Sequence, residues 1–356
     1  MLNSKKKHII WIDYAKVFGI FLVVYGHGNF CGDLFNYIYS FHMPMFFIIC
    51  GVLYKPVSLV QTLKKGWISL MRPYIILNLI CWTPFLIVKF LDDSLTMQYV
   101  FSKLGGVLLG LGYEKNGFSP ISSPCWFIYT LFLMKVILAV IPNHRSGTLL
   151  CVIGVSMLLT CYFQIANIDT LIPVDSALLA LPFMCCGYMY KEFITLKMFK
   201  TIPKGLLLLA FLFFCYSVDY NGMVGINRCF IGHSLILFYL NATIASVIFF
   251  SICNAFSSML FRLKYSIGID LTGGVKIIAS TTIIYIVFNL LIIDFTKIIL
   301  HYIFPMIDME GGLIGLSIAL IVFFEHIPLC LLCLRYFPIL VGNRKQIRGK
   351  KSTCFN

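Results

Sequence analysis

Three ionisable side chains share one face of the first apolar segment of the chain. Asp13, Lys16 and His27 lie within residues 9–28, which are otherwise largely apolar. At about 100° of rotation per helical residue, Lys16 and His27 fall about 20° apart, and Asp13 falls about 40° from His27. The pattern therefore predicts one helical stripe with a cation near one end and an imidazole about 16 Å further along.

A second imidazole follows at a comparable depth. His42 lies in the next apolar segment, ahead of Pro44, which opens the backbone locally, and Gly51, which permits close helix approach. A neutral imidazole accepts protons near physiological pH, so His27 is our candidate general base. His42 would orient it or donate to a developing oxyanion. A plainer interpretation is an Asp13–Lys16 ion pair at the start of a helix, with an interfacial His27.

The composition requires these residues to be positioned by membrane helices. The chain has 356 residues, of which 60% are hydrophobic and 12% are charged, and its mean hydropathy is +0.92. Soluble globular chains carry about 25% charged residues. The net charge of +14 comes from short basic clusters between apolar segments, which is the pattern of membrane orientation rather than of nucleic-acid binding. We expect no nucleic-acid partner.

Ten apolar segments are long enough to be candidate membrane helices, the sixth and seventh being the shortest. Backbone groups in lipid must be satisfied within the element, so an all-α helical bundle follows. With the N-terminus inside, the loops on the outer side carry only Lys103, Lys115 and Arg228, and the other loop cations lie inside. This predicts cytoplasmic termini. The segments are roughly 9–28, 36–54, 73–91, 124–142, 147–166, 174–190, 203–218, 231–253, 277–300 and 313–337.

Other signals favour plain structural interpretations. Most of the 14 cysteines lie in apolar runs, where cysteine behaves as a small hydrophobe, and the Cys330–Cys333 pair lacks a second pair for zinc. We expect no metal site. The first segment contains Asp13 and Lys16 and no small-residue cleavage site, so we interpret it as a retained helix rather than a signal peptide. The connection 92–123 is the longest and could hold a partly embedded segment.

Four motifs in the first 130 residues resemble the membrane acyltransferase-3 family. They are Trp11-Ile12-Asp13-Tyr14-Ala15-Lys16 leading to Val23-Val24-Tyr25-Gly26-His27, then Phe41-His42-Met43-Pro44-Met45-Phe46-Phe47 through Gly51, Arg72-Pro73-Tyr74, and Cys125-Trp126-Phe127-Ile128. The similarity is closest to the short branch that O-acetylates sugars, including fucose-type acetylases. Tyr265-Ser266-Ile267-Gly268 also resembles a late motif of the family.

The sequence departs from the family pattern at three places. Lys16 stands where the family usually has Arg, which keeps the charge but loses bidentate geometry. Cys50 precedes Gly51 where members often have Ser. The stretch after Gly268 offers Lys276 and no histidine.

The resemblance implies transfer of an acyl group, usually acetyl, from acyl-CoA to a sugar hydroxyl of a cell-surface or lipid-linked glycan. Arg72 with Lys16 would hold the CoA phosphates, although Arg72 could instead be a juxtamembrane anchor. Possible acceptor-side residues are Trp126, at a predicted interface where aromatic residues are common anyway, and the mid-span residues Glu325 and His326. Asp219, Asn221 and Arg228 in an outer connection could also contact a sugar.

The sequence thus predicts a membrane acyltransferase domain over residues 1–340 and a basic cytoplasmic tail over 341–356. We expect a multi-pass protein of the cell (inner) membrane whose partners are acyl-CoA, a glycan acceptor and lipids. Acetyl-CoA would be a co-substrate, and no cofactor would be tightly bound. A transporter or flippase for a lipid-linked sugar is the competing interpretation, and a non-catalytic membrane scaffold is a third. Consumption of acetyl-CoA distinguishes the first two.

Overall fold

The computed structural model describes residues 9–267, 270–306, 309 and 311–342, and it is helical. Within these residues no strand forms, and the only bridges of β type are the isolated pairs Lys115 with Phe118 and Gly225 with Phe230. The helices are α1 (Ile10–His27), α2 (Phe35–Leu53), α3 (Leu59–Gly66), α4 (Arg72–Leu91), α5 (Met97–Leu109), α6 (Trp126–Val140), α7 (Ser146–Ile165), α8 (Val174–Met189), α9 (Met198–Thr201), α10 (Lys204–Asn221), α11 (Leu235–Ile267), α12 (Thr272–Ser280), α13 (Thr282–Ile303) and α14 (Gly312–Tyr336).

Eight helical spans in the described part of the chain are long and apolar enough to cross a membrane. A ninth results if α8 and the bent segment Phe193–Thr201 count as one span. Helices form at all ten predicted segments, so the polytopic helical bundle is confirmed. The seventh segment, α10, is outside the eight because the polar residues Lys204, Asp219 and Asn221 at its ends lower its mean hydropathy.

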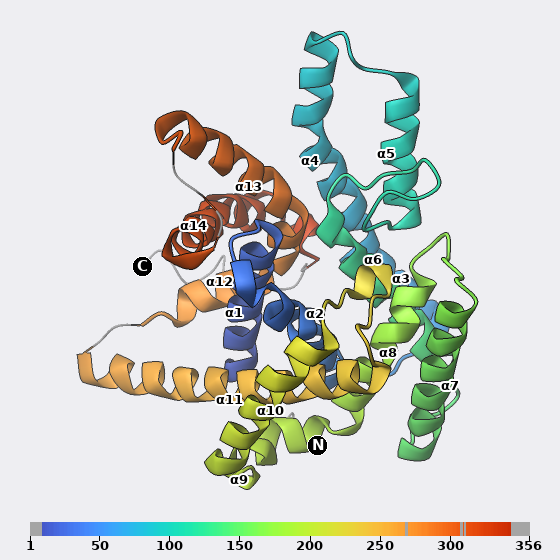
Figure 1. Ribbon diagram of the computed structural model, residues 1–356, viewed down its shortest axis with the longest axis vertical. Helices are drawn as coiled ribbons and strands as arrows, with labels where there is room; N and C mark the ends of the chain where they lie inside the picture. Colours follow the sequence, from blue (N-terminus) through green and yellow to red (C-terminus); the bar gives the residue numbers. More distant parts are fainter. Residues whose placement is uncertain (1–8, 268–269, 307–308, 310, 343–356) are drawn as a thin grey trace, which may run out of the picture.

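Helices α1 and α2 form the centre of the bundle (Figure 1). Helix α1 packs against α2, α11, α12, α13 and α14, while α2 packs against α8, α10 and α11. Helix α11 runs across the lower part of the view, and α4 and α5 project from the other end as a hairpin. The side chains carried by α1 and α2 are therefore surrounded by other helices on most sides.

The crossing of α2 and α8 depends on a glycine from each helix. A Cβ atom at Gly51 would lie 2.1 Å from the Met184 carbonyl oxygen, and one at Gly187 would lie 2.2 Å from the Ile48 carbonyl oxygen. Backbones this close are possible only where side chains are absent. The close approach predicted at Gly51 is confirmed. It fixes α2 against α8, and α2 also contributes His42 to the candidate site.

Two predicted features lie partly beyond what the structure describes. Residues 343–356, most of the predicted tail, are outside the described residues, and so is Gly268 of the late motif.

The long connection 92–123 contains a regular helix, α5, which ends at Gly110 with a φ of +72°. That left-handed conformation is one that glycine adopts without cost.

Candidate active site

A cavity of about 280 Å³ contains both imidazoles predicted from the sequence. We call it the histidine cavity. Its walls come from the ends of α1, α2 and α6, from the connection 223–230 and from α13. The lining residues include His27, Tyr39, His42, Met43, Phe46, Ser123, Pro124, Trp126, Phe127, Met223, Arg228, Phe230 and Ile286. The structure thus brings together His27, His42 and Trp126.

The two histidines are bridged by an aromatic ring. The Tyr39 ring centroid lies 6.0 Å from that of His27 and 4.9 Å from that of His42. His42 is 2% exposed, and its Nδ1 donates a hydrogen bond to the Ile38 carbonyl oxygen over 2.8 Å. Because a carbonyl can only accept, the proton of neutral His42 is on Nδ1 and the lone pair is on Nε2.

His27 has a different environment. Within the described residues neither of its ring nitrogens makes a hydrogen bond, and none joins the two imidazoles. A base needs a free lone pair within reach of the proton that it takes. His27 therefore presents unengaged nitrogens to the cavity, whereas only one nitrogen of His42 is available.

A second cavity, of about 400 Å³, lies nearer the start of α1 and is basic. We call it the lysine cavity. Four lysines from four segments line it: Lys16, Lys55, Lys65 and Lys135. Cys50, Tyr54, Thr62 and Ser69 also lie in its wall, and no carboxylate lines it. A cavity with several cations and no lining anion favours a ligand with more than one negative charge.

The two cavities share a wall. Phe46, Phe127 and Ile286 line both of them. Helix α1 carries Lys16 to one cavity and His27 to the other, which is the arrangement that the stripe on this helix predicts. A cation-lined space and an imidazole-lined space thus meet at an apolar partition.

Four other predicted site residues lie outside the lining of these cavities. Asp13 is half-buried on α1. Arg72 begins α4, and its buried Nε has no hydrogen-bond partner in the described structure. Glu325 is exposed and accepts a 2.5 Å hydrogen bond from Thr296.

His326 is fully buried between α13 and α14. Its ring stacks on Tyr285 with centroids 4.4 Å apart, and its Nδ1 donates to the Val322 carbonyl oxygen over 2.7 Å. The stacking packs α14 against α13, and the hydrogen bond to Val322 lies within α14. The structure does not bring Glu325 and His326 to the histidine cavity.

Sequence reasoning missed several lining residues. Lys135 is the only charged residue in Trp126–Val140, and an isolated lysine in an apolar span is a signal that could have singled it out. From the sequence alone, Lys55 and Lys65 are loop cations, and such residues indicate only the orientation in the membrane. Tyr39 gave no usable signal, because the chain has 19 tyrosines.

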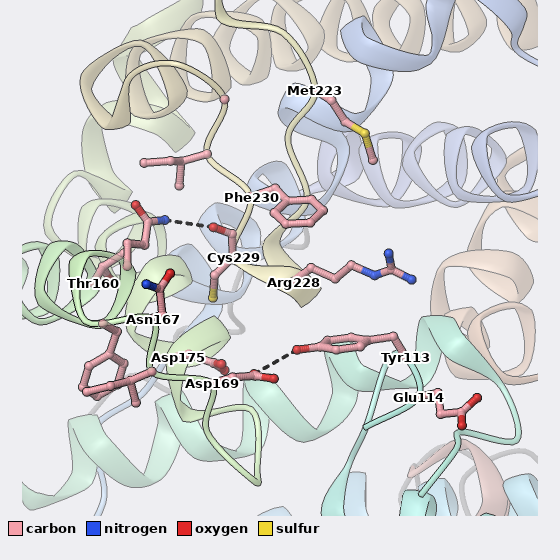
Figure 2. Close-up of a pocket in the computed structure, with 15 residues that line it drawn as sticks. Tyr113, Glu114, Thr160, Asn167, Asp169, Asp175, Met223, Arg228, Cys229 and Phe230 are labelled. Carbon is pink, nitrogen blue, oxygen red and sulfur yellow. Dashed lines mark hydrogen bonds between the residues drawn. The ribbon is translucent and has the colours of Figure 1, made fainter. Parts of the chain in front are cut away.

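A third cavity, of about 830 Å³, adjoins the histidine cavity and is shown in Figure 2. We call it the outer cavity. Met223, Arg228 and Phe230 line both it and the histidine cavity. Its other walls are the connection after α5, the end of α7 and the connection before α8. The polar residues there include Tyr113, Glu114, Thr160, Gln164, Asn167, Asp169 and Asp175.

Of the three polar residues predicted in the outer connection, only Arg228 lines this cavity. Asp219 accepts a 2.7 Å hydrogen bond from the Tyr37 hydroxyl. Asn221 is buried, and its amide holds the Ile231 carbonyl and the Ser234 N–H. Asp219 therefore joins α10 to α2, and Asn221 fixes the local backbone.

The fold and cavities define a polytopic membrane protein with an internal site that adjoins a basic cavity across an apolar partition on one side and a larger polar cavity on the other. A family model described as an acyltransferase domain, that of the acyltransferase-3 family, matches residues 9–335. The chain belongs to this family and is a multi-pass membrane acyltransferase. Neither a curated protein nor a solved structure is matched by the sequence.

Proposed function

We propose that this acyltransferase moves an acetyl group from acetyl-CoA to a sugar hydroxyl of a cell-surface or lipid-linked glycan, with His27 as general base. The observation that carries the proposal is the meeting of the lysine and histidine cavities at one partition. A donor in the first and an acceptor in the second would approach each other at Phe46 and Phe127.

The lysine cavity suits the donor. CoA carries several phosphate charges, and four lysines around one space supply the opposite charge without a lining carboxylate. Lys16 holds the position where the family usually has Arg, and its ammonium acts as a point charge rather than a bidentate fork. We infer that the phosphates lie among these lysines and that the thioester reaches the partition.

The histidine cavity suits the chemistry. A sugar hydroxyl attacks a thioester carbonyl when a base takes its proton, and His27 has the free nitrogens to do so. The tetrahedral intermediate then collapses, the carbon–sulfur bond breaks, and the imidazolium of His27 returns the proton to the leaving thiolate. The products are a sugar acetate ester and free CoA.

The position of the proton on the His42 ring bears on the choice between the two roles considered for this residue. Since Nδ1 is committed to Ile38, neutral His42 has no proton on Nε2 to give to an oxyanion. This favours a role in accepting a hydrogen bond from the acceptor hydroxyl over the donating role. Trp126, whose side chain also lines the cavity, carries an N–H that suits the developing negative charge.

The membrane orientation follows from the same proposal. Acetyl-CoA is a cytoplasmic metabolite, so the lysine cavity would open toward the cytoplasm of the cell membrane. That orientation agrees with cytoplasmic termini and with the scarcity of Lys and Arg in the opposite loops.

A single-turnover assay tests the proposal. The purified protein in lipid nanodiscs is mixed with acetyl-labelled acetyl-CoA and with surface glycan. The glycan is taken from cells that carry the protein and is chemically deacetylated. We expect label in the glycan, removable by mild alkali as an ester, with one CoA released for each acetyl transferred. Movement of a lipid-linked sugar across a bilayer with no CoA released would support the flippase instead.

A further inference from the structure

The outer cavity opens onto the histidine cavity at one short turn. Met223, Arg228 and Phe230 belong to the lining of both. Resting on the proposed function, we infer that the acceptor is a neutral glycan of several sugars. The acetylated sugar occupies the histidine cavity, and the preceding sugars occupy the outer cavity.

The sizes of the two spaces support an extended acceptor. Cavities that hold drug-sized molecules range from about 300 to 1,000 Å³. The histidine cavity, at about 280 Å³, lies just below that range and suits one sugar ring with the donor acyl group. The outer cavity, at about 830 Å³, is near the upper end. A single sugar would leave most of the combined space unused.

The turn between the cavities is held by its own backbone. Gly225 N–H donates to the Phe230 carbonyl over 2.8 Å, and Phe230 N–H donates back over 2.9 Å. Gln164 on α7 donates to the Cys229 carbonyl over 2.9 Å, as drawn in Figure 2. The turn is therefore fixed to α7, and Arg228 and Phe230 are presented at the junction by a braced backbone.

The carboxylates of the outer cavity are mostly engaged. Asp169 binds Lys115 and accepts a 3.0 Å hydrogen bond from the Tyr113 hydroxyl, and Asp175 accepts from the Ser176 N–H over 2.7 Å. Burial and the hydrogen bond to Asp169 raise the pKa of Tyr113, so this phenol stays protonated. Only Asp169 is paired with a cation, so Glu114, Asp175 and Arg228 have no ion-pair partner in the described structure.

A space whose unpaired charges are two carboxylates and one guanidinium gives no net attraction to an anionic glycan. It offers instead hydrogen-bonding groups and aromatic rings. The Arg228 guanidinium lies 5.2 Å from the Tyr113 ring centroid, and Phe230 remains 47% exposed. The C–H face of a sugar ring can bury against Phe230, while amides such as Asn167 bind its hydroxyls.

The test compares acceptors of different length. Deacetylated neutral surface polysaccharide from cells that carry the protein is partially hydrolysed and separated into fractions of one to eight sugars. Acetyl transfer is measured on each at saturating acetyl-CoA. We expect the acceptor KM to fall at least tenfold between the single sugar and the longer fractions. Phe230→Ala and Glu114→Gln should reduce this ratio, whereas Asp93→Asn, an exposed change at the tip of the α4–α5 hairpin, should not.

Four results would test the inference and the proposed function separately. Equal KM values for all fractions, with acetyl transfer intact, would overturn the extended acceptor and leave the O-acetyltransferase standing. A length dependence that survives both cavity variants would also overturn it. Release of CoA with no label in any glycan fraction would instead count against the sugar acceptor itself. Preference for a uronic-acid polysaccharide over the neutral one would contradict the charge argument.

Discussion

Phe46 on α2 and Phe127 on α6 pack with ring centroids 5.9 Å apart, and both rings line the lysine cavity and the histidine cavity. These two side chains, with Ile286, therefore separate the space assigned to the donor from the space assigned to the acceptor. Because the donor thioester must meet the acceptor here, the partition controls both acyl transfer and the access of water to the thioester.

Removing part of this partition should uncouple acetyl-CoA hydrolysis from acetyl transfer. Phe127→Leu removes part of the ring while keeping an apolar side chain, so water can reach the thioester more easily. We expect acetyl-CoA hydrolysis without acceptor to rise several-fold, measured as free thiol released. Phe47→Leu is the matched control, since Phe47 is a buried neighbour that lines neither cavity. Equal hydrolysis in the two variants would mean that Phe127 is not part of a barrier.

Lys135 should matter more for the donor than Arg72. Lys135 lines the lysine cavity and Arg72 does not. Loss of a charge-assisted contact costs about 1.5–3 kcal/mol, so Lys135→Ala should raise the acetyl-CoA KM by about tenfold or more. The acceptor KM should change little, and Lys135→Arg should retain most of the affinity. If Arg72→Ala raises the donor KM more than Lys135→Ala does, the donor site has been placed wrongly.

Lys16 should tolerate one substitution and not another. The acyltransferase-3 family usually has Arg at this position, and Lys16→Arg keeps the cation in the lysine cavity. We expect near-normal turnover for Lys16→Arg and a raised acetyl-CoA KM for Lys16→Ala, with both proteins accumulating in the membrane. Loss of activity in Lys16→Arg alone would indicate that the site requires the compact ammonium.

The contact between α2 and α8 should be sensitive to a single methyl group. Gly51→Ala would place a Cβ atom 2.1 Å from a backbone oxygen that cannot move away cheaply. Overpacking of this kind costs about 1–3 kcal/mol, so the melting temperature in detergent should fall. Gly154→Ala on α7 is the control, because nothing lies within 4 Å of the added atom. An unchanged melting temperature for Gly51→Ala would show that the helices can separate there.

The sequence alone predicts the helical architecture and the stripe on α1 that contributes to both cavities. Apolar length predicted the helices, and helical periodicity placed Lys16 and His27 on one stripe, because both depend only on local geometry. The roles of Glu325 and His326 could not be read in this way. The rest of helix α14 is apolar on nearly every side, so its sequence does not say which face meets α13, which meets lipid and which meets a cavity.

The lysine cavity could not be predicted from the sequence for a related reason. Its four lysines come from α1, α3, α6 and the connection after α2. Only the packing of these segments brings the side chains together. The outer cavity likewise joins three connections whose relative positions no local pattern specifies.

The role of His27 is the central claim, and its replacement tests that claim most directly. Removal of a positioned base costs about 10²–10⁴-fold in rate. His42→Ala should impair turnover less, because water can replace a single hydrogen-bonding nitrogen. Measuring membrane abundance beside activity separates catalysis from folding, since both histidines line the same cavity.

The decisive measurement is therefore the rate of acetyl transfer from acetyl-CoA to glycan by His27→Gln protein present at wild-type abundance in the membrane. The account predicts that transfer falls by at least about 10²-fold while acetyl-CoA binding persists. A His27→Gln protein that accumulates normally and acetylates its glycan at the wild-type rate would contradict the mechanism.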